Sequence, residues 1–198
     1  MDSRAQARLI EATELAYRWH ASQFRKGSRI PYISHLLQVQ GLVLEHGGDD
    51  EQAVAALLHD SLEDAETPDE ALARAKLIES RFGAGALAIV RDCSDTAIDE
   101  AGSAKGPWLE RKQRYHAQLA AASDRSLLVA ACDKLHNLNA LVWDVETHGV
   151  DYLDRFNASP AQQLWYFDAV AALFEGRVPV RLRNELLALL DRFRGLVG

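Results

Sequence analysis

Apolar residues recur three and four positions apart along almost the whole chain, which is the spacing of one face of an α-helix. Strict alternation of apolar and polar residues, which would indicate β-strands, is nearly absent. The spacing predicts helices over residues 3–24, 32–45, 53–64, 68–82, 84–92, 107–122, 126–147, 160–175 and 180–194. We therefore expect an all-α helical bundle of eight or nine helices.

Glycine and proline residues separate these predicted helices. Residues 25–31 form a basic loop that contains both, and residues 94–106 have the most loop-like composition in the chain. We expect the second of these loops to be a mobile flap. At the start of the fourth helix, Thr67, Pro68 and Glu70 match a capping box, with Thr67 as the N-cap residue.

Length and charge narrow the class of protein. The chain has 198 residues, enough for one domain with a substantial core, and 22 basic against 29 acidic residues give a net charge of −7. This charge argues against nucleic acid or an anionic membrane as the main partner. No stretch approaches the roughly 18 apolar residues of a membrane span, and no apolar signal core follows the N-terminus. Cys93 and Cys132 are isolated in apolar segments, so we expect free buried thiols and a cytoplasmic protein.

The strongest chemical signal lies in residues 53–64, where an Ala- and Leu-rich segment carries His59, Asp60, Glu63 and Asp64. If this segment is helical, His59 and Glu63 are four residues apart and share a face, as do Asp60 and Asp64. A cluster of charged groups beside a core is costly to bury without a cation or partner. A solvated helix end with a surface histidine is the alternative interpretation.

Two candidate ligands lie far from this segment. His35 is near the start of the predicted second helix, and Asp133 interrupts the apolar face of a later one. Together with His59 and Asp60 they supply two imidazoles and two carboxylates, a donor set that suits one divalent ion such as manganese, iron or zinc. Calcium and magnesium prefer shells of oxygen alone. The alternatives are a packed, hydrogen-bonded His35 and an Asp133 that pairs with Lys134 or Arg125.

Four linked motifs carry a resemblance to a known family: residues 19–27, 31–35, 58–64 and 133–137, within a match over about residues 5–145. In order and spacing they resemble the hydrolase domain of Rel/Spo-type alarmone enzymes, which belong to the HD phosphohydrolase superfamily. The resemblance implies removal of the 3′-pyrophosphate from (p)ppGpp by a metal-activated water, with Mn²⁺ as the cofactor. It also implies a small, stand-alone hydrolase with one HD domain, its core at residues 1–150 and C-terminal helices at residues 151–198 packed on that core.

The resemblance also assigns roles to single residues. The metal ligands would be His35, His59, Asp60 and Asp133, and the catalytic acidic pair would be Glu63 and Asp64. The residues that bind the nucleotide would be Arg25, Lys26 and Asn137.

Departures from the family pattern leave the substrate open. Leu36 stands where the family often has proline, and Asn139 and Ala140 stand where it commonly has an Arg-Thr pair in the nucleotide contact surface. Another HD phosphohydrolase, acting on NADPH, a deoxynucleoside triphosphate or a nucleoside monophosphate, is therefore the second hypothesis. A non-catalytic nucleotide sensor is the third. The expected partner is a small nucleotide in each case, and the oligomeric state, including a homo-oligomer, is left open.

Overall fold

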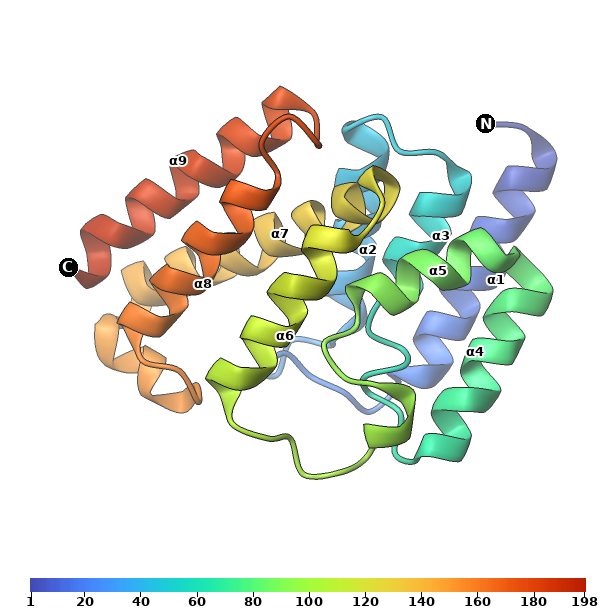
Figure 1. The fold of residues 1–198 in the computed structure, drawn as a ribbon, viewed down its shortest axis with the longest axis horizontal. Coiled ribbons are helices and arrows are strands. Elements are labelled where there is room, and N and C mark those ends of the chain that lie inside the picture. Colours follow the sequence, from blue (N-terminus) through green and yellow to red (C-terminus); the bar gives the residue numbers. More distant parts are fainter. The chain divides into compact units, whose positions relative to one another are not determined.

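A computed structural model describes all 198 residues and consists of nine α-helices and two short 3₁₀ helices, with no strand (Figure 1). The predicted all-α fold and its number of helices are therefore confirmed. The chain divides into two compact units, residues 1–104 and residues 105–198. The predicted division into residues 1–150 and 151–198 of one domain stays a prediction. None of the helices combines the length and the apolar character that crossing a bilayer requires.

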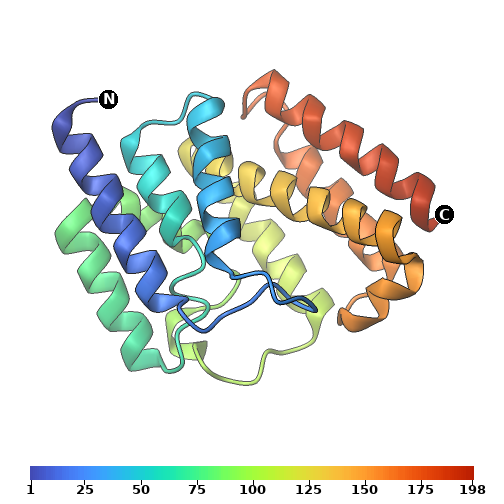
Figure 2. The ribbon, with the colours of Figure 1, turned by 180° about the vertical axis from the view of Figure 1, so that it is seen from behind.

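The first unit contains five α-helices and one 3₁₀ helix: α1 (Ser3–Trp19), α2 (Ile33–Glu45), α3 (Asp50–Leu58), α4 (Pro68–Phe82), α5 (Ala84–Cys93) and η1 (Ile98–Glu100). Helix α3 is the centre of this unit, because every residue from Gln52 to Leu58 is buried. It contacts α1, α2 and α5, and Figure 2 shows α1 and α2 on either side of it. An Ala- and Leu-rich helix can be surrounded in this way because it presents an apolar side chain in every direction.

Helix α1 ends earlier than the predicted boundary at residue 24. The backbone N–H of His20 donates to the Ala16 carbonyl as the C-cap, and the chain then turns over residues 20–22. Beyond this point the backbone pairs across the loop, from the Tyr32 N–H to the Gln23 carbonyl at 2.9 Å and from the Arg25 N–H to the Ile30 carbonyl at 2.8 Å. These pairs use backbone groups that a longer helix would need, so the prediction of a helix to residue 24 is wrong.

The start of α4 forms only half of the predicted capping box. The Thr67 hydroxyl accepts a hydrogen bond from the Glu70 N–H at 3.2 Å, as expected of an N-cap residue. The Glu70 carboxylate instead accepts from the Glu66 N–H at 2.8 Å and from Arg74 at 2.6 Å. Both hydrogen bonds lower the pKa of Glu70, with the backbone bond to Glu66 as the largest cause. The Glu70 carboxylate thus binds the Glu66 N–H and Arg74 in place of the N–H of Thr67.

The first part of the predicted flap packs inside the first unit, to which it belongs. Ala101 is buried with Ala65 and Ala71, and Ile98 packs against this small cluster. Gly102 has a φ of +72°, and a Cβ placed on it would lie 1.9 Å from the Glu66 carbonyl oxygen. This close approach is open only to glycine. Mobility of the loop stays a prediction.

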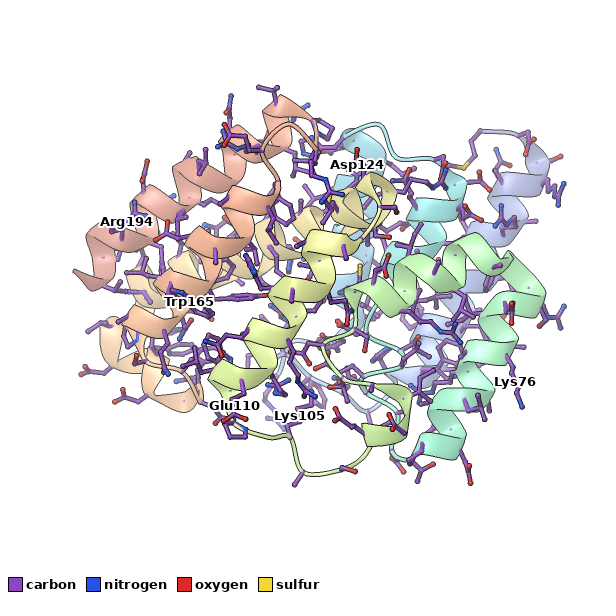
Figure 3. All side chains as sticks on the ribbon, in the orientation of Figure 1. Lys76, Lys105, Glu110, Asp124, Trp165 and Arg194 are labelled. Carbon is purple, nitrogen blue, oxygen red and sulfur yellow. The ribbon has the colours of Figure 1, made fainter.

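The second unit contains α6 (Trp108–Ala121), α7 (Asp124–His148), η2 (Val150–Arg155), α8 (Pro160–Leu173) and α9 (Val180–Val197). Helix α7 is its longest element, and α9, η2 and α8 all contact it. Helices α8 and α9 also contact each other, and Arg194, labelled in Figure 3, donates a 2.7 Å hydrogen bond to Asp168 on α8. The two cysteines, Cys93 in the first unit and Cys132 in the second, are buried thiols that form no disulfide, as expected.

Candidate functional site

The sequence motif of His59 to Asp64 lies in a series of turns directly after α3, not within a helix as predicted. Neighbouring side chains take the carbonyl groups that a continuing helix would use. The His59 ring bonds to the Ala56 carbonyl at 2.8 Å, and the Ser61 hydroxyl donates to the Leu58 carbonyl at 2.6 Å. Buried Arg74 donates to the Ser61 carbonyl at 2.8 Å. Such side-chain bonds compete with the helix, and here they end it at Leu58.

The turn brings His59 and Asp60 together with His35 of α2. One potential ligand atom from each residue lies within 4.8 Å of the others, which is close enough for a single metal ion to bind all three. The Asp60 Oδ2 atom is 3.0 Å from His59 Nε2 and 3.6 Å from His35 Nε2. Both histidines are buried, while the side chain of Asp60 is 17% exposed. Three of the four predicted metal ligands thus converge within the first unit.

The hydrogen bonding of His59 fits a role as a metal ligand. A carbonyl oxygen can only accept, so the contact with Ala56 requires the proton on Nδ1 of the ring. Nε2 then carries the lone pair of the ring, on the side that faces Asp60. Metal-binding histidines are typically oriented by such a bond from the other ring nitrogen. The donor set of two imidazoles and one carboxylate therefore suits a divalent first-row ion.

Tyr32, just before α2, supports the Asp60 carboxylate. Its hydroxyl donates to Asp60 Oδ2 at 2.5 Å. Its ring stacks on His20, with ring centroids 5.3 Å apart and an interplanar angle of 28°, and lies 5.4 Å from the His35 ring. A residue that sets the orientation of a ligating carboxylate in this way affects metal affinity without touching the ion.

The predicted acidic pair has two different environments. Glu63 Oε2 accepts a hydrogen bond from the backbone N–H of Asp95 at 3.4 Å, so it faces the loop that follows α5. Asp64 Oδ2 accepts from the side-chain amide of Gln23 at 2.8 Å and lies 3.8 Å from His20 Nδ1. Both residues are partly exposed. They therefore have access to solvent and to protons while lying in the same turn as His59.

The predicted basic pair lies in the loop between α1 and α2. Lys26 is exposed and Arg25 is half-buried, with its guanidinium 5.8 Å from the centroid of the Tyr32 ring. A planar cation over an aromatic face is a stabilising arrangement. The loop thus places Arg25 beside the residue that holds Asp60.

In the second unit, Asp133 is buried on α7 and accepts hydrogen bonds from Asn137, at 2.6 Å, and from Lys134. The pairing with Lys134 is one of the alternatives that the sequence left open. Burial, the largest single influence, would lower the pKa of Lys134. The charge of Asp133 and the Tyr115 and Tyr166 side chains outweigh burial, so the pKa is raised well above its ordinary value. The predicted role of Asp133 as a metal ligand and that of Asn137 in nucleotide binding stay predictions.

Sequence reasoning assigned no role to three residues that adjoin this site: His20, Gln23 and Tyr32. All three lie within the motifs that carried the resemblance, so position was an available signal. Their contacts depend on the directions of their side chains after α1 ends. The sequence predicted a helix to residue 24, and residue spacing along that helix does not predict these directions.

Comparisons with known proteins agree with the geometry. A family model described as an HD domain matches residues 12–151. The guanosine-3′,5′-bis(diphosphate) 3′-pyrophosphohydrolases MESH1 of Homo sapiens and Xenopus tropicalis are each 35% identical to this chain, with 68% of this chain and 70% of theirs covered. The zebrafish (Danio rerio) MESH1 is 36% identical over 71% of this chain.

The fold agrees as well. The solved structure of a metazoan ortholog of SpoT that hydrolyzes ppGpp matches with a TM-score of 0.73 and 25% identity, covering 96% of this chain and 97% of that one. A structure from Listeria monocytogenes EGD-e, at 22% identity and a TM-score of 0.65, shares the fold. The chain therefore belongs to the HD-domain family and, within it, to the relatives of the guanosine-3′,5′-bis(diphosphate) 3′-pyrophosphohydrolases.

Proposed function

We propose that this protein is a metal-dependent hydrolase that removes the 3′-pyrophosphate from guanosine tetra- and pentaphosphate. The observation that carries the proposal is the convergence of His35, His59 and Asp60, with Glu63 and Asp64 in the same turn. The same activity is named for relatives that are 35% identical over 68% of the chain. Both the chemistry of the site and the relationship support hydrolysis of a phosphate ester.

Binding of a divalent metal ion follows from the HD domain and from the donor set in the first unit. We propose Mn²⁺ as that ion, with His35, His59 and Asp60 as ligands and Asp133 as the fourth, which rests on the sequence motif. When bound, such an ion depresses the pKa of a coordinated water and stabilises negative charge on phosphate oxygens.

Glu63 and Asp64 carry out the proton transfers of the reaction. The oxygen of the attacking water forms a bond to the phosphorus next to the 3′ oxygen, and the bond from this phosphorus to the 3′ oxygen breaks. Glu63 takes the proton that the water loses, and a proton is returned to the departing 3′ oxygen. Asp64 has a fixed hydrogen bond from Gln23 at 2.8 Å and is the second carboxylate of this relay.

Basic and polar residues bind the substrate. Arg25 and Lys26 are donors to phosphate oxygens, and Arg25 also presents a flat guanidinium to a base. Asn137 contributes a side-chain amide to the nucleotide pocket. Because Asn139 and Ala140 replace an Arg-Thr pair in the family pattern, a different nucleotide remains the second candidate substrate.

One turnover panel tests the proposal. The purified protein is incubated with ppGpp, pppGpp, NADPH, deoxynucleoside triphosphates and nucleoside monophosphates, with and without Mn²⁺, and the products are identified by ³¹P NMR. We expect pyrophosphate together with GDP or GTP, only when Mn²⁺ is present. His59→Ala should abolish turnover, while His148→Gln, at an exposed position on α7, should not. Faster turnover of another nucleotide, or tight ppGpp binding with no turnover at any metal, would contradict the assignment.

We also propose that the protein is located in the cytoplasm. The two buried thiols fit a reducing compartment, where thiols persist.

A further inference from the structure

We propose that Gln23 is a positioning residue that holds the Asp64 carboxylate in its working orientation, with the His20 ring fixing the direction of the Gln23 amide. This inference rests on the proposed function in one respect, namely that Asp64 takes part in catalysis. All three residues lie in the first unit: His20 at the end of α1, Gln23 in the segment between α1 and α2, and Asp64 in the turn after α3.

The Gln23 backbone is held on both sides. Its N–H donates to the His20 carbonyl at 3.1 Å, and its carbonyl accepts from the Tyr32 N–H at 2.9 Å. The side chain therefore starts from a fixed point in the short segment between α1 and α2. From there its amide reaches Asp64, which is 41 positions further along the chain.

The direction of the amide follows from the chemistry of its two partners. An ionised carboxylate only accepts hydrogen bonds, so the Nε2 group of Gln23 faces Asp64 Oδ2, at 2.8 Å. The amide oxygen then faces His20 Nδ1, at 2.5 Å, and since this oxygen only accepts, Nδ1 must carry the proton. The result is a chain of two hydrogen bonds, called the relay below, in which the His20 ring donates to the Gln23 amide and the amide donates to the Asp64 carboxylate.

His20 is suited to fix this direction because its ring cannot turn freely. The residue is 3% exposed, and the ring stacks on Tyr32 at 5.3 Å. Its Nε2 atom is buried and makes no hydrogen bond, so the ring is anchored through Nδ1. Burial, the largest influence, lowers the pKa of His20, which keeps the ring neutral with one proton to place.

The relay has a mechanistic consequence. Tyr32, the stacking partner of His20, donates to Asp60, so Asp60 and Asp64 are both oriented from the segment between α1 and α2. A carboxylate that must exchange a proton with the reacting groups works only within a narrow range of positions. Loss of the Gln23 amide leaves Asp64 in place along the chain but removes the 2.8 Å hydrogen bond that Gln23 donates to its carboxylate.

A double-mutant cycle tests the role. Gln23→Met keeps the length of the side chain and removes both hydrogen bonds, and Gln38→Met on exposed α2 surface is the matched control. We expect Gln23→Met to lower kcat about 10- to 100-fold, as loss of a hydrogen bond to a charged group does, with KM changed by less than about twofold. In an Asp64→Asn background the same substitution should have no further effect. An equal loss in that background, or no loss in the wild-type background, would overturn the proposal.

A second measurement does not depend on turnover. The ring nitrogens of His20, observed by ¹⁵N NMR in the metal-free protein, should show a neutral ring protonated at Nδ1. Gln23→Met should shift this ring toward the Nε2–H tautomer. An Nε2–H tautomer in the wild-type protein would refute the relay. If the wild-type protein hydrolyses no guanosine nucleotide, the proposed function fails. The tautomer of the His20 ring still shows whether the hydrogen bonds from His20 to Gln23 and from Gln23 to Asp64 exist.

Discussion

Tyr32 shows how one hydroxyl group can control the candidate metal centre. It donates to Asp60 Oδ2 at 2.5 Å while its ring contacts both His20 and His35. We predict that Tyr32→Phe, which keeps the ring and removes the hydroxyl, weakens Mn²⁺ binding about 10- to 100-fold, because Asp60 loses the partner that orients it. Isothermal titration calorimetry with Mn²⁺ on the metal-free protein measures this effect.

The matched control for that experiment is Tyr17→Phe. Tyr17 lies on α1, with 52% of its surface exposed, and the same loss of a hydroxyl there should leave Mn²⁺ affinity unchanged. Equal affinity of Tyr32→Phe and the wild-type protein would show that Asp60 needs no such support.

His20 gives a prediction on the pH dependence of stability. Its pKa is lowered in the folded protein, chiefly by burial, so the unfolded chain binds a proton at a higher pH than the folded protein does. The contribution of His20 to stability is therefore fully present above a pH of about 6.5 and is lost as the pH falls below it. In metal-free protein, His20→Asn should make the free energy of unfolding fall less steeply between about pH 6.5 and pH 5. Urea unfolding at a series of pH values tests this, and parallel curves for the two proteins over the whole range would count against it.

At the residue scale, the sequence predicted which residues belong to the candidate metal site better than it predicted the directions of their side chains. It identified His35, His59 and Asp60, and the structure brings these three together. It did not identify the partners that orient them, because a hydrogen bond such as that from Gln23 to Asp64 joins residues 41 positions apart. No periodicity along the chain records which way an amide or a hydroxyl points.

At the scale of elements, helices were predictable and the ends that form the site were not. Spacing of apolar residues predicted a helix over residues 53–64, but α3 spans Asp50–Leu58, so the prediction is right only for residues 53–58. The turn that follows depends on Arg74, which comes from α4 and donates to the Ser61 carbonyl. Helix propensity of Ala and Leu is a local property, and here a contact with another element overrides it.

Gly102 places the loop after α5 against the backbone of Glu66, just after the turn that carries His59 to Asp64. A Cβ at this position would lie 1.9 Å from the Glu66 carbonyl oxygen, and its φ of +72° is unfavourable for other residues. We predict that Gly102→Ala lowers the free energy of unfolding by about 1–3 kcal/mol, because either the loop or the backbone at Glu66 must move. It should also reduce kcat, since Asp95 in the same loop donates to Glu63. Chemical denaturation and steady-state kinetics of the variant measure the two effects.

Gly106→Ala is the control within the same loop. A Cβ there meets nothing within 4 Å, so the substitution should change stability by no more than about 0.5 kcal/mol. If the two variants unfold alike, the contact between Gly102 and Glu66 does not hold the loop.

At the scale of the whole molecule, class and family were predictable because they depend on many residues at once. Helical spacing across the chain gave the all-α fold, and motifs spread over about residues 5–145 gave the HD-domain family, whose model matches residues 12–151. The division into two units after residue 104 was not predictable, because the chain around it shows only the composition of a loop. Asp133 illustrates the remaining difficulty: its pairing with Lys134 and its proposed role as a metal ligand are both compatible with one buried carboxylate.

Metal-induced stabilisation of the whole protein separates these two roles. Ions that bind only the folded state stabilise it, by about 2.7 kcal/mol at a hundredfold excess over Kd, so the wild-type Tm should rise by roughly 5–10 °C with Mn²⁺. Asp133→Asn lowers the Tm of the metal-free protein in either case, because it leaves the buried Lys134 without its carboxylate. The discriminating quantity is therefore the further rise on adding Mn²⁺, which should fall by more than half in Asp133→Asn and vanish in His59→Ala. The exposed Asp151→Asn should keep the full rise. A full rise in Asp133→Asn together with none in His59→Ala would leave a metal centre of His35, His59 and Asp60 and assign Asp133 to the ion pair alone.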